Sequence, residues 1–292
     1  MFHEIAAIFR PGDVLVINDT RVKPARLYGR RPTGAKVEVL LLGKRNDSLW
    51  YTMLKGASKG EIVFEDGLSA RIVGREDMIF QLRFNADPEV WAERHGAVPL
   101  PPYIRRPADD EDKIRYQTVY ASRPGAIAAP TAGLHFTPAI IDELKTRGVE
   151  ICQITLHVGM GTFKPVTAET ITDHRMDEEE FIIGEDTARA VTLASAEERR
   201  IIAVGTTATR TLETAFCNGK LRAGPGATSL FITPGYNFKA VGGLLTNFHL
   251  PKATPLMLVS AFAGIENVRR AYRAAVKERY GFFSYGDAML VL

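Results

Sequence analysis

The fold is decided by the stretch DVLVINDTRVKPARLYGRRPTGAKVEVLLL, which covers residues 13–42. Its first part, DVLVIND, is a short apolar run that ends in polar residues, a pattern typical of a buried strand. The carboxyl ends of such strands are where α/β sheets bind ligands. The polar residues delivered there are Asn18, Asp19, Thr20 and Arg21.

From about Pro24 to about Tyr120 the chain contains short β-rich runs separated by turn residues. The runs are AKVEVLLL, LWYTML, GEIVFEDG, SARIVG and MIFQLRF. This spacing is typical of a small antiparallel barrel or sandwich. The proline-rich VPLPPYIRRP near its end reads as an extended connector.

After Ser122 the pattern changes to helices alternating with apolar strands, which is typical of an α/β fold. Thr137 can cap a helix that has Pro138 at its first position and Gly148 as its terminator. The strand VEICQITLHVG follows and places His157 on its more polar face. Residues 199–216, RRIIAVGTTATRTLETAF, predict a strand, a short Gly-Thr loop and a helix.

The composition is that of a soluble globular protein with one or two domains: 292 residues, 46% hydrophobic and 24% charged. Cys152 and Cys217 have no partners at metal-ligand spacing, so neither a disulfide scaffold nor a metal site is indicated. No apolar run approaches the roughly 18 residues of a membrane span, and the start lacks the layout of a secretion signal. We therefore expect a cytoplasmic protein with no metal and no membrane association.

The formal net charge of +3 is a weak signal, but the basic residues are unevenly distributed. Between Thr20 and Val37 there is a basic cluster without any acid. Such a run either neutralises nucleic-acid phosphates or is simply solvated, and a charge run alone usually means the latter. The members that we consider for RNA binding are Arg21, Lys23, Arg26, Arg30 and Arg31.

Two glycine- and threonine-rich loops each carry a histidine: IAAPTAGLHFTP, residues 127–138, and TLHVGMGTFKP, residues 155–165. Glycine lets a backbone approach a ligand closely, and histidine transfers protons near neutral pH. Either histidine alone is more often a structural residue. Two such loops beside regular elements favour an active site.

Further candidates lie in the last third of the chain. The free N–H groups at the start of the helix after Val204 favour an anion, so Thr206 and Thr207 are candidates for holding a carboxylate or phosphate. The strand-like GGLLTNFHLP presents Asn247 and His249. The Gly-x-Gly-x-x-Gly arrangement of a dinucleotide site is missing.

Several motifs together resemble the S-adenosylmethionine:tRNA ribosyltransferase-isomerase family of queuosine biosynthesis. They are PGDVLVINDTRVKPARL, YQTVYA, APTAGLHFTP, TLHVGMGTFKPV, DHRM, IAVGTTATRTLE, FITPGYNFKAVGGLLTNFHLPKATPLMLVSAFAG and RYGFFSYGDAML. The resemblance runs from about Phe9 to Leu292. It implies an α/β domain with an inserted antiparallel β-barrel domain: residues 1–23 and 121–292 form the first, and residues 24–120 the second.

The resemblance also implies the reaction. The family transfers and isomerises the ribosyl group of S-adenosylmethionine onto 7-aminomethyl-7-deazaguanine at the tRNA wobble position. The product is epoxyqueuosine-tRNA, and adenine and methionine are released. S-adenosylmethionine is then a co-substrate, the partner is a tRNA carrying the precursor base, and neither a metal nor a protein partner is implied.

This chemistry needs a proton-transferring residue, donors for ribose and adenine, and a site for the methionine carboxylate. The candidate proton carriers are His135, His157, His249, Asp19, Glu213 and Asp287, and the sequence does not rank the three histidines. The candidate substrate-binding residues are Asn18, Thr20, Thr131, Gly133, Gly159, Gly161, Thr162, Thr206, Thr207, Arg210 and Asn247. The basic cluster is the candidate for holding tRNA phosphates, with the modified base turned out of its stack.

The chain departs from the family pattern in two places. The family carries a further segment before the Pro-Gly-Asp motif, including a run that ends in Ser-Arg-Leu-Leu, so we expect a mis-set or shortened start that removes a strand and part of a binding surface. Where the family reads His-x-Met-His-x-Glu, the chain has Asp177 at the second histidine position, so no role is transferred there. His174 and Met176 match the pattern, and Glu179 corresponds to the glutamate.

Two alternative functions stay open at this point. An S-adenosylmethionine-dependent RNA methyltransferase would use the same co-substrate, although its usual glycine-rich loop after the first strand is missing. A tRNA-binding protein that has lost catalysis together with the missing N-terminal segment is the second alternative. The first would form S-adenosylhomocysteine instead of adenine, and the second would leave the tRNA mass unchanged.

Overall fold

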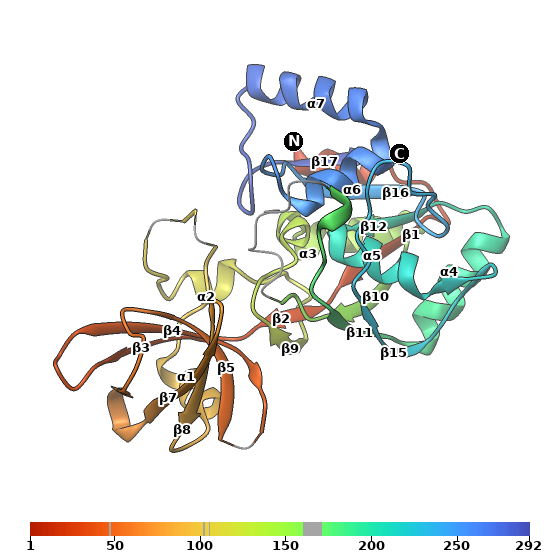
Figure 1. The fold of residues 1–292 in the computed structure, drawn as a ribbon. Helices are drawn as coiled ribbons and strands as arrows, with labels where there is room; N and C mark the ends of the chain where they lie inside the picture. The colour runs from red at the N-terminus through yellow and green to blue at the C-terminus, as the bar shows by residue number, and fades with distance from the viewer. Residues whose placement is uncertain (47, 102, 105, 160–170) are drawn as a thin grey trace. The chain divides into compact units, whose positions relative to one another are not determined.

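The computed structural model describes residues 1–46, 48–101, 103–104, 106–159 and 171–292. The chain divides into two compact units, which are described separately. Unit 1 combines Met1–Arg21 with Gln117–Leu292, and unit 2 is Val22–Tyr116. Figure 1 shows the two, with the barrel of unit 2 in orange.

Unit 1 is built on a seven-stranded sheet with the order β15-β11-β10-β1-β12-β16-β17. Its centre is parallel: β1 pairs in parallel with β10 and β12, and β12 pairs in parallel with β16. The outer strands β11, β15 and β17 are antiparallel to their neighbours. The bounds are β1 (Val14–Asn18), β10 (Glu150–Leu156), β11 (Glu179–Ile183), β12 (Ile201–Val204), β15 (Gly224–Thr228), β16 (Gly243–Asn247) and β17 (Ala288–Val291).

The central strand β1 is buried on both faces, which explains why its sequence is continuously apolar. Val14 and Val16 face the core that α4 (Glu185–Ala196) and α5 (Gly205–Ala215) cover. Leu15 and Ile17 face the opposite core, formed with α3 (Pro138–Thr146). The sheet is therefore a middle layer between helices (Figure 1).

The remaining elements of unit 1 are two helices that pack against β16 and several short strands and 3-10 helices. A third apolar cluster joins Leu244 of β16 to α6 (Thr254–Ala263) and α7 (Ile265–Lys277). β2 pairs with β9, and β13 pairs with β14. The bounds are η1 (Phe2–Ala7), β2 (Thr20–Val22), β9 (Arg123–Ala126), η3 (Thr131–His135), η5 (Ile171–Asp173), β13 (Phe216–Cys217) and β14 (Lys220–Leu221).

Unit 2 is a closed barrel with the strand order β3-β4-β5-β8-β7-β6. Alternate side chains point inward and form a core of their own that includes Leu27, Val39, Trp50, Ile62 and Leu82. The bounds of its elements are β3 (Arg26–Arg30), β4 (Lys36–Lys44), β5 (Leu49–Lys55), β6 (Glu61–Val63), η2 (Glu65–Gly67), β7 (Ser69–Glu76), β8 (Ile79–Phe84), α1 (Pro88–His95) and α2 (Asp112–Arg115).

The predicted fold class, an α/β domain with an antiparallel β-barrel, is confirmed. The structure corrects one local prediction: no loop separates β12 from α5, because Gly205 adopts φ +84° and turns the chain within a single residue. Thr206 and Thr207 therefore lie in the first turn of α5. The sequence also did not single out β3 or α1 as elements. In the part of the chain that the structure describes, no helix is both long and apolar enough to cross a membrane.

Candidate active site

The parallel strands β1, β10, β12 and β16 bring their carboxyl ends to one edge of the sheet. Most of the predicted site residues of unit 1 follow directly after these strands. We call this region the carboxyl edge. Its residues are Asn18 at the end of β1 with Asp19 and Thr20 after it, His157 and Gly159 after β10, Thr206 and Thr207 after β12, and Asn247 at the end of β16 with His249 after it.

Asn18 is the hub of the carboxyl edge. Its Oδ1 accepts hydrogen bonds from the backbone N–H of Leu156 at 3.0 Å and of Thr20 at 3.2 Å. Its Nδ2 donates to the carbonyl oxygen of Leu156 at 3.0 Å and to Thr207 Oγ1 at 3.3 Å. One buried amide therefore links β1, the end of β10 and the first turn of α5.

His157 is held by Thr20, whose Oγ1 lies 2.8 Å from His157 Nδ1. The ring lies against Gly125, where a Cβ would lie 2.4 Å from both Nδ1 and Cε1 of the imidazole. Only glycine leaves room for the ring at this position. Gly125 was not predictable from the sequence, because the contact joins residues 32 positions apart.

Asp19 is buried and its carboxylate is bound from three sides. Oδ1 accepts a hydrogen bond from Thr155 at 2.5 Å, and Oδ2 accepts one from Ser122 at 2.8 Å and lies 3.8 Å from Arg123 Nε. Asp19 also lines a cavity of about 400 Å³ beside α4. Asp19, a predicted proton carrier, therefore links the end of β1 to β10 and to the segment at Ser122 and Arg123.

Arg210 forms a buried ion pair with Glu179 and also donates to the backbone oxygens of Leu230 at 2.9 Å and Thr228 at 3.2 Å. Glu179 in turn accepts a hydrogen bond from the backbone N–H of Gly159 at 3.0 Å. The guanidinium predicted to bind a substrate carboxylate is thus engaged with a carboxylate of the protein. A role in substrate binding remains a prediction for Arg210.

Glu213 is 2% exposed and lies one turn further along α5. Its carboxylate accepts hydrogen bonds from the backbone N–H groups of Lys239, Ala240 and Val241 at 2.9–3.0 Å, and from Tyr236 Oη at 3.2 Å. The structure therefore shows Glu213 fastening the segment before β16 to α5. Proton transfer by Glu213 stays a prediction.

His135 and Asp287 line one cavity of about 480 Å³, in which Phe2 stacks on the His135 ring at 5.1 Å. Burial lowers the pKa of His135, while Asn247 and Asp287 act in the opposite direction. His135 Nε2 and Asn247 Oδ1 are both buried, and neither completes a hydrogen bond of ordinary geometry. Asn247 is fixed from its other side, because Nδ2 donates to the oxygen of Phe283 at 2.8 Å.

His249 is buried like His135, but its Nε2 has a hydrogen-bond partner. Its Nε2 lies 2.8 Å from Thr246 Oγ1, and its backbone N–H donates to Tyr272 Oη at 2.8 Å. Burial lowers its pKa to about 4. The imidazole is therefore neutral near pH 7 and carries no proton there that it could donate as an imidazolium.

Two predicted residues lie in η3, beside His135. Thr131 is its first residue and is half-buried. Gly133 is packed so tightly that a Cβ would lie 2.2 Å from Tyr120 Oη. The other two predicted residues of the second loop, Gly161 and Thr162, lie outside the described residues.

The basic cluster is partly neutralised within unit 2. Lys23 pairs with Glu89, and Arg26 lies 2.9 Å from Glu38 and donates to the oxygen of Leu100. Arg30 is exposed and donates to the carbonyl oxygen of Gly34 at 3.1 Å. Arg31, half-buried in unit 2, and Arg21, exposed in unit 1, complete the cluster.

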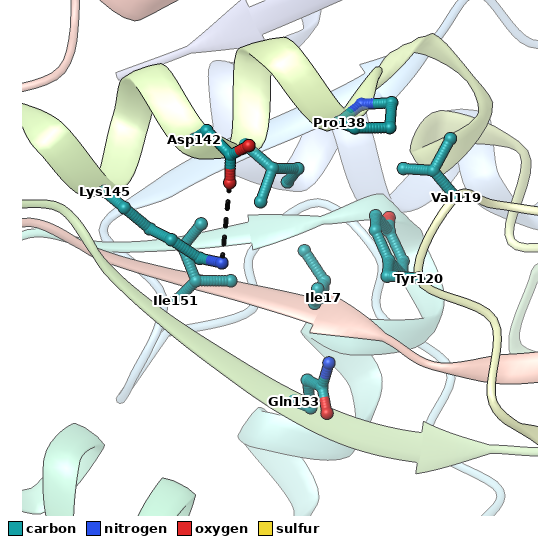
Figure 2. A pocket seen from close by; sticks show the side chains of 9 residues that line it. Ile17, Val119, Tyr120, Pro138, Asp142, Lys145, Ile151 and Gln153 are labelled. Atoms are coloured by element: carbon teal, nitrogen blue, oxygen red, sulfur yellow. Dashed lines mark ion pairs between the residues drawn. The ribbon is translucent and has the colours of Figure 1, made fainter.

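A further cavity, of about 370 Å³, lies between α3 and the strands β1 and β10 (Figure 2). Its wall is mostly apolar and includes Ile17 and Ile151, while Asp142 and Lys145 form an ion pair at its rim. None of the predicted site residues lines it. Within the described residues, no group of three or more potential ligands is arranged to hold a metal ion.

Fold and site together define an α/β protein whose predicted site residues gather at the carboxyl edge of a parallel sheet. The family model described as queuosine biosynthesis protein matches residues 1–291. The chain therefore belongs to the S-adenosylmethionine:tRNA ribosyltransferase-isomerase family of queuosine biosynthesis and is a transferase.

Curated relatives bear the name S-adenosylmethionine:tRNA ribosyltransferase-isomerase. The one from Geobacter metallireducens is 52% identical and aligns with 99% of this chain and 88% of its own length. The one from Syntrophotalea carbinolica is 50% identical, with 100% and 88% covered. A crystal structure of S-adenosylmethionine tRNA ribosyltransferase from Thermotoga maritima is 38% identical, with a TM-score of 0.53 and coverage of 99% of this chain and 86% of that one.

Proposed function

We propose that the protein transfers and isomerises the ribosyl group of S-adenosylmethionine onto 7-aminomethyl-7-deazaguanine at the wobble position of a tRNA in the cytoplasm. Epoxyqueuosine-tRNA is the product, and adenine and methionine leave. The observation that carries the proposal is the hydrogen-bonded network at the carboxyl edge, in which Thr207, Asn18, Thr20 and His157 are linked in series. The network combines a proton carrier with an anion-favouring helix start.

His157 is our first candidate for the base that removes the proton from the ribose carbon next to the sulfonium. Thr20 fixes the orientation of the ring through Nδ1, and Gly125 provides the space in which it lies. A base held by a second residue loses less freedom when it reacts. Thr20→Val should therefore lower turnover, and Thr20→Ser should restore most of it.

His135 is our candidate for the acid that assists the departure of adenine. Among the described residues, its buried Nε2 and the buried acceptor Oδ1 of Asn247 complete no hydrogen bond of ordinary geometry. Buried polar atoms of this kind are rare unless a ligand or water satisfies them. They fit a polar base such as adenine better than an apolar group.

The start of α5 is our candidate for the methionine carboxylate. Among the residues whose positions are described, no side chain caps this helix, and uncapped N–H groups at a helix start favour an anion. Thr206 and Thr207 lie in that first turn and are half-buried. In this proposal Arg210 supports the site indirectly, through Glu179 and Gly159.

The proposal is tested by incubating the protein with S-adenosylmethionine and tRNA that carries the precursor base, and by measuring adenine and methionine release. Equal amounts of both products are expected, and His157→Ala should abolish most of the release. S-adenosylhomocysteine in place of adenine would indicate methyl transfer. An unmodified tRNA that lacks the precursor base is the control.

A further inference from the structure

The outer face of the barrel carries two pairs of like-charged side chains in directly opposite positions. Arg30 of β3 is in register with Lys36 of β4, and Arg71 of β7 is in register with Arg83 of β8. All four residues are exposed. Like charges that face each other across antiparallel strands destabilise a sheet. Both repulsions oppose the folding of the barrel, and only Arg71 also faces an acid, Glu61 of β6, on its other side.

The two pairs belong to one continuous strip. Val63 of β6 is in register with Arg30 on one side and with Ser69 of β7 on the other, and Arg71 is the next outward residue after Ser69. The strip thus crosses β4, β3, β6, β7 and β8. Adjacent strands lie about 4.8 Å apart, so it spans roughly 19 Å. We call Arg30, Lys36, Arg71 and Arg83 the basic strip.

Among the described residues, none of the four members of the basic strip forms an ion pair, whereas Lys23 and Arg26 of the same barrel do. The acid closest in register is Glu61, opposite Arg71. Two exposed apolar side chains accompany the strip: Tyr28, 45% exposed, and Val63, 46% exposed.

We propose that the basic strip binds the phosphate backbone of an RNA, which rests on the tRNA partner of the proposed function. A phosphate between two facing cations turns their repulsion into attraction, and arginine binds phosphate with two parallel hydrogen bonds. The exposed Tyr28 ring offers a face on which an unpaired base stacks. The strip adds Lys36, Arg71 and Arg83 to the residues that contact tRNA.

The test is the salt dependence of tRNA binding by the double variant Arg71→Gln/Arg83→Gln. Each lost phosphate contact makes the slope of log affinity against log salt shallower by about 0.7–0.9, so a decrease of about 1.4–1.8 is expected. The matched control is Arg94→Gln/Arg189→Gln, which removes the same charge from exposed positions on α1 and α4. The control slope should equal that of the unmodified protein.

The melting temperature of the free protein is the second readout. Because the substitutions remove a repulsion, it should stay the same or rise in the double variant while tRNA affinity falls. A double variant that bound tRNA weakly only because it was misfolded would have a lower melting temperature. In that case the salt dependence is measured with the single variant Arg83→Gln, for which half the slope change is expected.

A double-variant slope equal to that of the control would overturn the role of the basic strip. If adenine release stayed normal in that case, the proposed function would stand without it. Conversely, a protein that binds tRNA through the strip but releases no adenine contradicts the proposed function alone. Competition by polyglutamate as strong as that by RNA would show that the strip binds acidic chains and would overturn the assignment to RNA.

Discussion

At the scale of single residues, the carboxyl edge depends on a few tightly packed atoms. The ring of His157 has room only because residue 125 lacks a Cβ, and Thr20 Oγ1 holds that ring from the other side. Such a seat is sensitive to a displacement of less than 1 Å. Substitutions of one or two atoms therefore test it better than large ones.

Gly125→Ala should lower kcat/KM for adenine release by about 10- to 100-fold, because the new Cβ must displace the imidazole. The fold should be retained, since Gly125 does not adopt a positive φ. Gly43→Ala is the matched control, because its Cβ would meet no atom within 4 Å. Unchanged kinetics for Gly125→Ala would show that His157 is not seated as described.

His249 should make the free energy of unfolding depend on pH. Its pKa falls from 6.5 to about 4 on folding, so the unfolded chain binds more protons between these values. The contribution of neutral His249 to the free energy of unfolding is complete above pH 6.5 and is lost as the pH falls towards 4. The loss is about 2–3 kcal/mol at pH 4.5. Urea unfolding at pH 7.5 and 4.5 measures how much free energy of unfolding each protein loses on acidification. His249→Gln should lose less than the unmodified protein by this amount. Equal losses would show that His249 is not buried as a neutral imidazole.

Many residues of the carboxyl edge could be predicted from the sequence because they lie at or just after the end of a predicted strand. Asn18, Thr20 and His157 follow apolar runs, which is enough to predict that they meet at one edge of a parallel sheet. Their partners were not predictable, because contacts such as Asn18 with Thr207 join residues 189 positions apart. The sequence therefore indicates the site but not how each side chain is held.

At the scale of elements, α5 fastens two neighbouring segments through carboxylates. Arg210 binds Glu179 on β11, and Glu213 binds the backbone before β16. Periodicity correctly predicts the apolar stripe of this helix, Ala208, Leu212, Ala215 and Phe216, which is buried. Arg210 and Glu213 lie on its polar face and were predicted to bind or act on the substrate, and in the structure both contact other segments of the protein.

Removing one member of the Arg210–Glu179 pair should destabilise the protein strongly. Arg210→Met leaves Glu179 buried without its partner, which costs about 3–5 kcal/mol in the free energy of unfolding. The double variant Glu179→Gln/Arg210→Met should recover part of this loss, because no unpaired charge remains. Denaturant titration of the four proteins of the cycle measures the coupling, and additive losses would contradict a direct pair.

Glu213→Gln should also be destabilising, by about 2–3 kcal/mol, because an amide N–H would face backbone donors that now bind a carboxylate. The charge-matched control is Glu185→Gln at an exposed position on α4, with an expected change within about 0.5 kcal/mol. Chemical denaturation compares the two. A normal stability in Glu213→Gln would argue that the buried carboxylate is kept for another purpose, such as proton transfer.

At the scale of the whole molecule, we propose that the two units are separate domains, with the barrel inserted into the α/β domain. The barrel strands alternate apolar and polar residues, and this alternation predicts most of them. β3 is the exception, because Gly29 occupies an inward position where a Cβ would lie 2.8 Å from Ile62 and Phe64. Only the closed barrel shows why this strand has a glycine in place of an apolar side chain.

A fragment covering residues 22–116 should fold without the rest of the chain, because the barrel is closed and has its own buried core. Circular dichroism should show a cooperative thermal transition for this fragment. A fragment that is unfolded, while the full chain is folded, would show that the barrel depends on unit 1 for its stability.

We propose that the carboxyl edge performs ribosyl transfer to tRNA with His157 as the base. The most direct measurement is the mass of the wobble nucleoside after a single turnover with S-adenosylmethionine and precursor tRNA, for the unmodified protein and for His157→Gln. The mass of epoxyqueuosine is expected for the unmodified protein and unchanged precursor for His157→Gln. Conversion at equal rates by both proteins would show that His157 is not the base.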